Sequence, residues 1–399
     1  KRVDILEAQG NLADAVLDLE SMLRKYADSN MLRDRLIIAY LKSGQQAKAE
    51  AILKDVIALY PTEGRWHEAL GDFYQSLPEG DLVAATASYL RAYQLSPARR
   101  TIVKLRTVTR GGERWDYDAM IDLIQASGMA ASSDPQMIGL YARAFAGKGA
   151  FDRADTQLKR SYPLLVSSIA RGDLSELSLR QWYEDLYAVY ANRDPEQGAA
   201  LAASIVGEGT TYWDNVGMGT YWALFGKQRY AQAIIEQQKA VDRSASEAPE
   251  MRTTMLNLLG SYQIGNGNPE LAAQTFKNII DENPTDASAL NNYAYIIATS
   301  LGRADEALPY AQRAIAVEPR SVDILDTIST IHALLGEHEK SMVSRLRHHT
   351  LEPDNVEVVL DISRSYMSHF ADAEKALEFA ELASKIMPKD PEVMGTLGW

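Results

Sequence analysis

A run of basic side chains is the most concentrated chemical feature of this sequence. No acid interrupts it, and Arg100 and Lys104 are four residues apart, which places them on one face of a helix. Such a face could hold an acidic partner segment or a phosphate group. Alternatively, it is a solvated surface whose charges pair with acids of neighbouring elements, such as Asp72, Asp81 or Glu113. The run comprises Arg91, Arg99, Arg100, Lys104, Arg106 and Arg110.

Aromatic side chains are crowded into residues 182–230. Exposed rings there could stack on sugars or anchor a protein partner. Alternatively, large rings fill the core of an irregular helical region, and the helical spacing of Tyr183, Tyr187 and Tyr190 favours this second interpretation. The ten aromatics are Trp182, Tyr183, Tyr187, Tyr190, Tyr212, Trp213, Tyr221, Trp222, Phe225 and Tyr230.

No motif for metal, cofactor or catalytic chemistry is present. The adjacent His348 and His349 would diverge by roughly 100° on a helix, so they cannot share a metal ion, and His332 is expected to be packed. Phosphate-binding glycine loops, paired zinc-binding histidines and serine nucleophile elbows are missing from the sequence. We therefore expect a protein that is not an enzyme, with no cofactor, no metal and no catalytic residue.

Composition excludes further classes. The chain has 54 acidic residues against 41 lysines and arginines, a formal net charge of −13, whereas general nucleic-acid binding needs a net basic field. No apolar run approaches the roughly 18 residues of a transmembrane helix. Cysteine is absent, which excludes disulfides, thiolate metal sites and a cysteine nucleophile.

The elements that position these residues follow from an internal repeat. A glycine is followed five residues later by a small residue in seven places, and neighbouring glycines lie 34, 36, 35 and 34 residues apart within the regular stretches. Pro61, Pro97, Pro284, Pro319, Pro353 and Pro388 keep a similar spacing. The seven pairs are Gly10/Ala15, Gly44/Ala49, Gly80/Ala85, Gly149/Ala154, Gly267/Ala272, Gly302/Ala307 and Gly336/Ser341.

Each period predicts two short amphipathic helices. In residues 30–61, Gly44 ends the first helix, since glycine tolerates the left-handed turn after a helix, and Pro61 follows the second. The small residue after the turn allows two antiparallel helices to cross closely. The apolar faces are expected to be Leu36, Ile37 and Tyr40 in the first helix, and Ala49, Leu53, Val56 and Leu59 in the second.

These positions resemble the tetratricopeptide repeat family, whose pattern runs through a large residue, Leu-Gly, an aromatic, a small Ala, a bulky residue and a Pro. Residues 64–97, 287–319 and 356–388 match it in part. The resemblance implies an all-α, right-handed superhelical solenoid of helix-turn-helix repeats. Residues 253–284 match it with Leu256, Leu259-Gly260, Ala272, Phe276 and Pro284.

The resemblance also implies that the first helix of each pair lines a concave groove that binds a protein or peptide partner. Asparagine can bond an extended peptide backbone as donor and acceptor, although the same positions could be ordinary solvated ones. From helix phase, the inward positions of the C-terminal array are Asn257, Asn291, Asn292, Tyr295, Asp326, Thr330, Asp361 and Arg364.

One known binding mode of the family does not fit these positions. Some members hold chaperone C-terminal carboxylates with Lys, Arg and Asn on successive first helices. Asn257 and Asn292 resemble the asparagine members of that clamp, but Asp326 and Asp361 occupy positions that should be cationic. Two acids would repel a carboxylate, so we exclude this mode.

The repeat divides the chain into three parts: an N-terminal array at 1–160, a degenerate aromatic-rich region at 161–250 and a C-terminal array at 251–399. We expect about ten complete helix pairs and half a pair at each end, as in a fragment of a longer protein. The spacing in the middle leaves 16 surplus residues, which we expect at 161–177 and 243–250, with a kink or a change of superhelix between residues 161 and 250.

We therefore expect an interaction scaffold for a protein or peptide, and a bacterial envelope or polysaccharide-export assembly is one setting for it. The periplasm or envelope is slightly favoured over the cytoplasm by a loose resemblance to large bacterial arrays. We do not expect nucleic acid as a partner or a membrane span in this chain, and we favour glycan binding less than protein or peptide binding. The alternative is the substrate-recruiting arm of an enzyme, such as a glycosyltransferase, with a catalytic domain outside this chain.

Overall fold

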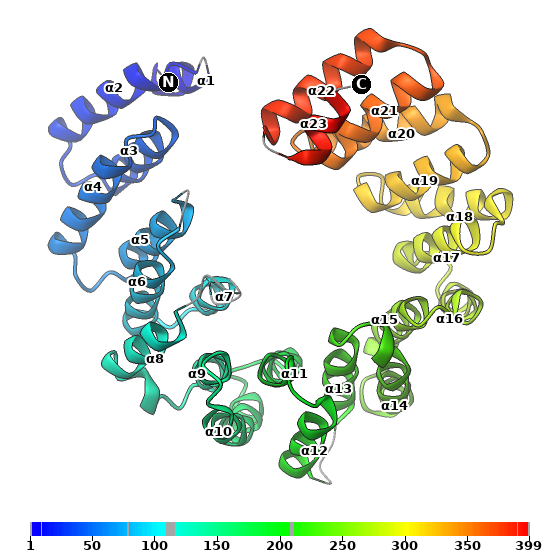
Figure 1. Cartoon of the computed structure of the whole chain (residues 1–399), viewed down its shortest axis with the longest axis horizontal. Helices are drawn as coiled ribbons and strands as arrows, with labels where there is room; N and C mark the ends of the chain where they lie inside the picture. The colour runs from blue at the N-terminus through cyan, green and yellow to red at the C-terminus, as the bar shows by residue number, and fades with distance from the viewer. Residues whose placement is uncertain are drawn as a thin grey trace. The chain divides into compact units, whose positions relative to one another are not determined.

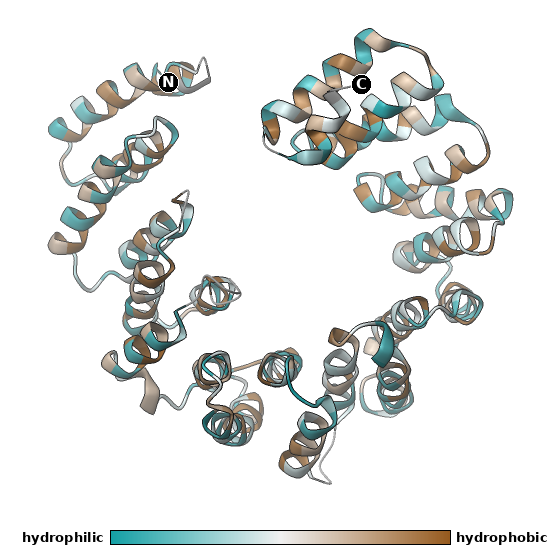
Figure 2. Cartoon of the chain, in the orientation of Figure 1, coloured by the Kyte–Doolittle hydropathy of each residue, from teal (hydrophilic) through white to brown (hydrophobic). Residues whose placement is uncertain are grey.

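A computed structural model describes residues 2–8, 10–77, 80–108, 116–207, 211–388 and 390–397. These residues form 23 α-helices and three 3₁₀ turns, without a strand. The chain forms two compact units, Lys1–Val206 and Gly207–Trp399. Each helix in Figure 2 carries both apolar and polar residues, as expected for helices that bury one face.

Unit one contains α1 to α12, and successive helices pack against one another along the chain except at α7 and α8, where α8 packs against α6 and α9 (Figure 1). The helices are α1 (Arg2–Ala8), α2 (Leu12–Lys25), α3 (Asn30–Lys42), α4 (Gln46–Leu59), α5 (Gly64–Ser76), α6 (Leu82–Leu95), α7 (Arg99–Val108), α8 (Tyr117–Ala126), α9 (Pro135–Gly147), α10 (Phe151–Ala170), α11 (Leu177–Tyr190) and α12 (Pro195–Val206).

Unit two contains α13 to α23, and again successive helices pack against one another. The helices are α13 (Tyr212–Leu224), α14 (Tyr230–Glu247), α15 (Arg252–Gly265), α16 (Pro269–Glu282), α17 (Ala287–Thr299), α18 (Ala304–Val317), α19 (Val322–Leu334), α20 (His338–Leu351), α21 (Val356–His369), α22 (Ala373–Ile386) and α23 (Pro391–Leu397). From α3 to α22, the described residues form ten helix pairs, and this confirms the predicted all-α array.

The glycines that mark the period are the turns between paired helices. All seven have positive φ, for example +73° at Gly44 and +78° at Gly267, a backbone conformation that costs glycine little. The small residue five positions later is buried in every case, with 0% exposure at Ala49 and Ala272 and 1% at Ser341. The predicted close crossing of paired helices therefore rests on these small side chains.

A second close approach explains the Leu-Gly position of the repeat. A Cβ added to Gly260 on α15 would lie 2.5 Å from Cζ of Phe276 on α16, and Phe276 has 0% exposure. The ring lies directly on the glycine backbone, so its position depends on the missing side chain. One predicted core residue differs: Leu59 is 64% exposed, because it ends α4 beyond the buried stretch that finishes at Val56.

The surplus residues of the middle region largely extend two helices. Helix α10 has 20 residues and continues through Pro163, and α14 has 18 residues, whereas most other helices of the pairs have 13 or 14. These extensions fall within the two segments that the sequence singled out, 161–177 and 243–250. The apolar face of α10 continues beyond the proline with Leu165 buried, and this burial outweighs the lost backbone hydrogen bond.

The crowded aromatics fill the cores of the two units. Seven of the ten rings are buried and the other three are half-buried. In unit one, Trp182 donates a 2.9 Å hydrogen bond to Ser161 Oγ and packs against Tyr162 with ring centroids 5.0 Å apart. In unit two, Tyr221 has 0% exposure and packs against Trp222. The geometry therefore favours core filling over stacking on a glycan.

An ion pair in unit one joins helices that are two repeats apart. Arg106 on α7 binds Asp185 on α11 through two hydrogen bonds of 2.5 and 2.8 Å, and both residues are buried. Helix α9 lies against both helices, and a Cβ at its Gly139 would lie 2.1 Å from Asp185 Oδ2. Glycine at this position therefore leaves room for the ion pair.

Candidate functional site

The first helices of successive pairs in unit two repeat one polar position. Asn257 on α15, Asn291 on α17 and Asp326 on α19 each lie three residues before the small residue at which the helix packs on its partner, namely Gly260, Ala294 and Ser329. Because the helical phase is the same, the three side chains occupy equivalent places on their helices. We call these three residues the acceptor row.

The two asparagines of this row carry oxygen atoms without hydrogen-bond donors. Asn257 Nδ2 donates to the carbonyl of Thr253 at 3.1 Å, which holds the amide in place. The Oδ1 atoms of Asn257 and Asn291 are buried and receive no hydrogen bond from the described residues. A buried acceptor without a donor costs about 1–3 kcal/mol, so an amide that turned outward to accept an N–H group from a ligand would recover this cost.

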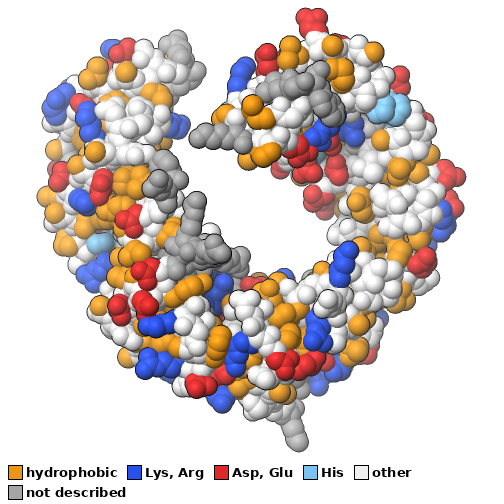
Figure 3. All heavy atoms as spheres, viewed as in Figure 1, with side chains coloured by type: hydrophobic (Ala, Val, Ile, Leu, Met, Phe, Trp, Pro, Cys, Tyr) orange, Lys and Arg blue, Asp and Glu red, His pale blue; other side chains and the backbone are white. Residues whose placement is uncertain are grey.

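The third member of the row begins an acidic surface. The Asp326 side chain is exposed, yet its pKa is raised. The largest cause is desolvation by the surrounding protein, and the negative charges of Asp361 and Glu357 on α21 add to it. His348 and Arg345 lower the pKa in part. The acids of α21 therefore act on Asp326 of α19. Figure 3 shows acidic side chains gathered over these helices.

Arg364 provides only partial compensation on this surface. Its guanidinium lies 3.6 Å from Asp361 Oδ1 and 2.5 Å from Glu392 Oε1 on α23, so two acids already share its charge. Asp323 and Glu357 are exposed at the starts of α19 and α21. Their spacing of three or four residues from Asp326 and Asp361 places them on the same faces. The surface therefore remains net negative, which would repel a carboxylate.

The other predicted residues of the inward face have different environments. Tyr295 on α17 is 45% exposed and its ring is free to contact a partner. Asn292 and Thr330 are half-buried. Together with the acceptor row they form a surface that is neutral and polar on α15 and α17 and acidic on α19 and α21.

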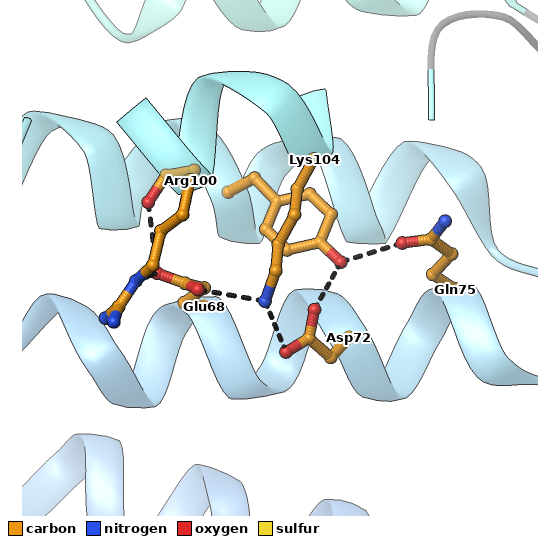
Figure 4. A network of polar contacts seen from close by, with 7 residues as sticks. Glu68, Asp72, Gln75, Arg100 and Lys104 are labelled. Atoms are coloured by element: carbon orange, nitrogen blue, oxygen red, sulfur yellow. Dashed lines mark hydrogen bonds and ion pairs between the residues drawn. The ribbon is translucent and has the colours of Figure 1, made fainter. Parts of the chain in front are cut away.

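The basic pair singled out in the sequence has partners within unit one. Arg100 Nε lies 3.0 Å from Glu68 Oε2, and Lys104 Nζ lies 2.9 Å from Glu68 Oε1 and 2.7 Å from Asp72 Oδ2 (Figure 4). Burial raises the pKa of Glu68, but the hydrogen bonds it accepts from α7 outweigh burial and lower that pKa. These two cations join α7 to α5. Arg110 of the predicted run and Glu113, one of its suggested acidic partners, lie outside the described residues.

Comparison with known families agrees with this architecture. Residues 257–322 match one model of the tetratricopeptide repeat, and residues 34–62 match a second. The chain carries tetratricopeptide repeats. The first match covers the helices that present Asn257 and Asn291, so the acceptor row begins within recognised tetratricopeptide helices.

Several solved structures are similar to parts of this tetratricopeptide array. MamA has 19% identity and a TM-score of 0.37, over 43% of this chain and 95% of its own. TTC0263, a thermophilic TPR protein in Thermus thermophilus, has 21% identity and a TM-score of 0.38, over 47% and 97%. YrrB, a TPR protein with an unusual peptide-binding site, has 15% identity and a TM-score of 0.37, over 47% and 91%. No curated protein sequence matches the chain.

The described part of the tetratricopeptide array shows no cluster of three or more histidine, aspartate or glutamate side chains arranged to hold a metal ion. His332 is buried, with Nδ1 2.6 Å from Glu337 Oε2. None of the described helices combines the length and apolar character that crossing a membrane requires.

Sequence reasoning missed Glu357 and Asp323 on the acidic surface, and it did not separate Arg99 from the rest of the basic run in unit one. The first two follow the spacing of three and four residues along one helix face, which could have identified them. Arg99 differs from Arg100 only by one position, and the sequence gives no sign that the two side chains have different surroundings.

Proposed function

We propose that unit two binds an extended, basic peptide segment of a protein partner along α15, α17, α19 and α21. The observation that supports this proposal is the acceptor row, because Asn257, Asn291 and Asp326 all present oxygen atoms and two of these atoms are buried without a donor. An extended backbone supplies N–H donors, and a lysine or arginine would complement the acids of α19 and α21.

The spacing of the helices gives the peptide its approximate length. Packed helices lie about 8–10 Å apart, and of these four helices α17 packs against α19, so the three steps from α15 to α21 cover at least roughly 24–30 Å. An extended chain rises about 3.3 Å per residue, so a segment of at least roughly eight residues is needed to cross the four helices. Basic side chains are expected toward the α19 and α21 end of that peptide.

Fluorescence anisotropy with labelled nonapeptides tests this proposal. The probes are an alternating Lys-Ala peptide and an alternating Glu-Ala peptide of equal length, each titrated with the whole 399-residue chain. We expect saturable binding of the basic peptide alone, with weaker binding as salt is raised. Equal binding of both peptides, or of neither, would contradict the proposal.

Two variants and one matched control locate the site. Asn291→Ala combined with Asp326→Asn should weaken basic-peptide binding about tenfold or more, since one charge-assisted hydrogen bond contributes about 1.5–3 kcal/mol. Asn291, Asn292 and Tyr295 replaced together by alanine should also weaken it. Asp305→Asn removes an equally negative, exposed side chain from α18 and should leave binding unchanged.

The biological setting is a separate part of the proposal. We place the scaffold in a bacterial envelope assembly, and we favour a non-catalytic role over that of a recruiting arm of a glycosyltransferase-like enzyme. Fractionation of cells that express the native gene tests the compartment, and a cytoplasmic location would contradict it. The sequence of the complete reading frame tests the enzyme alternative, which requires a catalytic domain in the same polypeptide.

A further inference from the structure

A polar cavity in unit one lies between three successive first helices. Its volume of about 190 Å³ is several times the ~30 Å³ that one water occupies in the liquid. Its walls come from α7, α9 and α11, and three arginines line it: Arg99, Arg106 and Arg180. Glu184 is the only acid among its lining residues.

Two of the three arginines retain donor capacity toward this cavity. Arg99 is exposed and forms no hydrogen bond or ion pair with the described residues. Arg180 has a buried Nε that donates to no acceptor, and its nearest acid oxygen, Glu184 Oε1, is 3.7 Å away. Glu184 also accepts a 2.8 Å hydrogen bond from Gln181, so its charge is shared.

The third arginine fixes the wall of the cavity. The two hydrogen bonds between Arg106 and Asp185 hold α7 and α11 at a set separation, and Arg143 lies 3.6 Å from the same carboxylate. With these groups included, four arginines surround two acids. The amino end of α11 also lies at the cavity, and the positive end of its dipole adds to the field.

The neighbouring basic residues show why this position is distinct. Arg100 and Lys104 on α7 point to Glu68 and Asp72 of α5, where their charges are compensated (Figure 4). Arg99 and Arg106 of the same helix line the cavity instead. One helix therefore uses Arg100, Lys104 and Arg106 in ion pairs. Its Arg99, with Arg180 of α11, lines a space large enough for a small molecule.

We propose that this cavity binds a compact oxyanion group, a phosphate monoester or a carboxylate, between Arg99 and Arg180. Planar guanidinium groups match the oxygen spacing of both anions and bind them through two parallel hydrogen bonds. The Arg180 side chain is 42% exposed, so its guanidinium can reach a bound anion. The site is separate from the peptide face of unit two, and its test does not depend on peptide binding.

Isothermal titration of the whole chain with inorganic phosphate, O-phosphoserine and succinate, at constant ionic strength, tests this proposal. We expect one site per chain for phosphate or for succinate. Competition between phosphate and O-phosphoserine would assign the site to phosphate monoesters, and saturable binding of succinate alone would assign it to carboxylates. No saturable binding of any of the three would overturn the proposal.

Three variants connect binding to the cavity. Arg99→Gln and Arg180→Gln should each weaken binding about tenfold or more. Arg100→Gln is the control, because Arg100 pairs with Glu68 and does not line the cavity, and this variant should bind as the unaltered chain does. Glu184→Gln removes the lining acid and should strengthen binding several-fold, a gain that misfolding cannot produce. Unchanged affinity in the Arg99 and Arg180 variants, with their circular dichroism preserved, would refute the site.

Discussion

Removal of the Asp185 carboxylate is the sharpest test of how unit one is held together. Asp185 is 2% exposed and Arg106 is 5% exposed, and two hydrogen bonds of 2.5 and 2.8 Å join them. In Asp185→Ala, the Arg106 guanidinium would stay in the interior without its carboxylate. Breaking one partner of a buried ion pair costs about 3–5 kcal/mol, which is a large part of the stability of an average domain, about 5–15 kcal/mol.

The loss is measured by urea unfolding, followed through circular dichroism and the fluorescence of tryptophan. With slopes of about 1–3 kcal/mol per molar urea, a cost of this size lowers the midpoint of the unit-one transition by about 1 M or more. Asp118→Ala is the matched control, since the Asp118–Lys148 pair is exposed on both sides and such pairs contribute about 0–1 kcal/mol.

A double replacement separates charge from packing. Arg106→Met with Asp185→Leu removes both charges and keeps apolar volume, and it should recover most of the lost stability, because a buried ion pair is often no more stable than a well-packed apolar one. The reasoning is refuted if Asp185→Ala unfolds at the same urea concentration as Asp118→Ala. It is also refuted if the double variant is less stable than Asp185→Ala.

Three further predictions concern stability and titration. Gly260→Ala should destabilise unit two by about 1–3 kcal/mol, since the new Cβ would lie 2.5 Å from Phe276. Gly395→Ala is the control and should leave stability unchanged, because a Cβ there would have nothing within 4 Å. Thermal unfolding compares the two variants. Pro163→Ala should stabilise unit one by up to about 3 kcal/mol in urea unfolding, because α10 continues through this residue, and no gain would mean that the helix breaks there. Burial and then the Asp155 carboxylate raise the pKa of Tyr190 to about 12. This tyrosine therefore stabilises the fold fully below pH ~10, and its contribution is lost as the pH rises through 12. In Asp155→Asn, tyrosinate absorbance should show that Tyr190 titrates at a lower pH, and a titration curve identical to that of the unaltered chain would contradict the assigned cause.

The sequence predicted the fold well because the repeat is fixed by local constraints. A glycine at positive φ and a small residue five positions later can be recognised without tertiary information, and both were found at all seven places, for example at Gly44 and Ala49. The extension of α10 was not predicted, since the proline penalty is local while the burial of Leu165 that offsets it is tertiary.

The site residues were predictable only in part, for a related reason. Helix phase places Asn257, Asn291 and Asp326 on equivalent faces, but the absence of a donor for the two amide oxygens among the described residues depends on what surrounds them. Likewise, Arg99 and Arg100 are identical in type and adjacent in sequence. Only the folded position of α7 decides that Arg100 pairs with Glu68 of α5 while Arg99 lines the cavity beside α11.

The bond from α7 to α11 has a mechanical consequence. In arrays where each repeat touches only its neighbours, pulling on the ends can detach repeats one at a time. The ion pair between Arg106 and Asp185 bridges two repeats that are not adjacent. Helices α7, α9 and α11 would therefore unfold together under force. Under force, this stretch would act as a stiff link within an otherwise compliant spring.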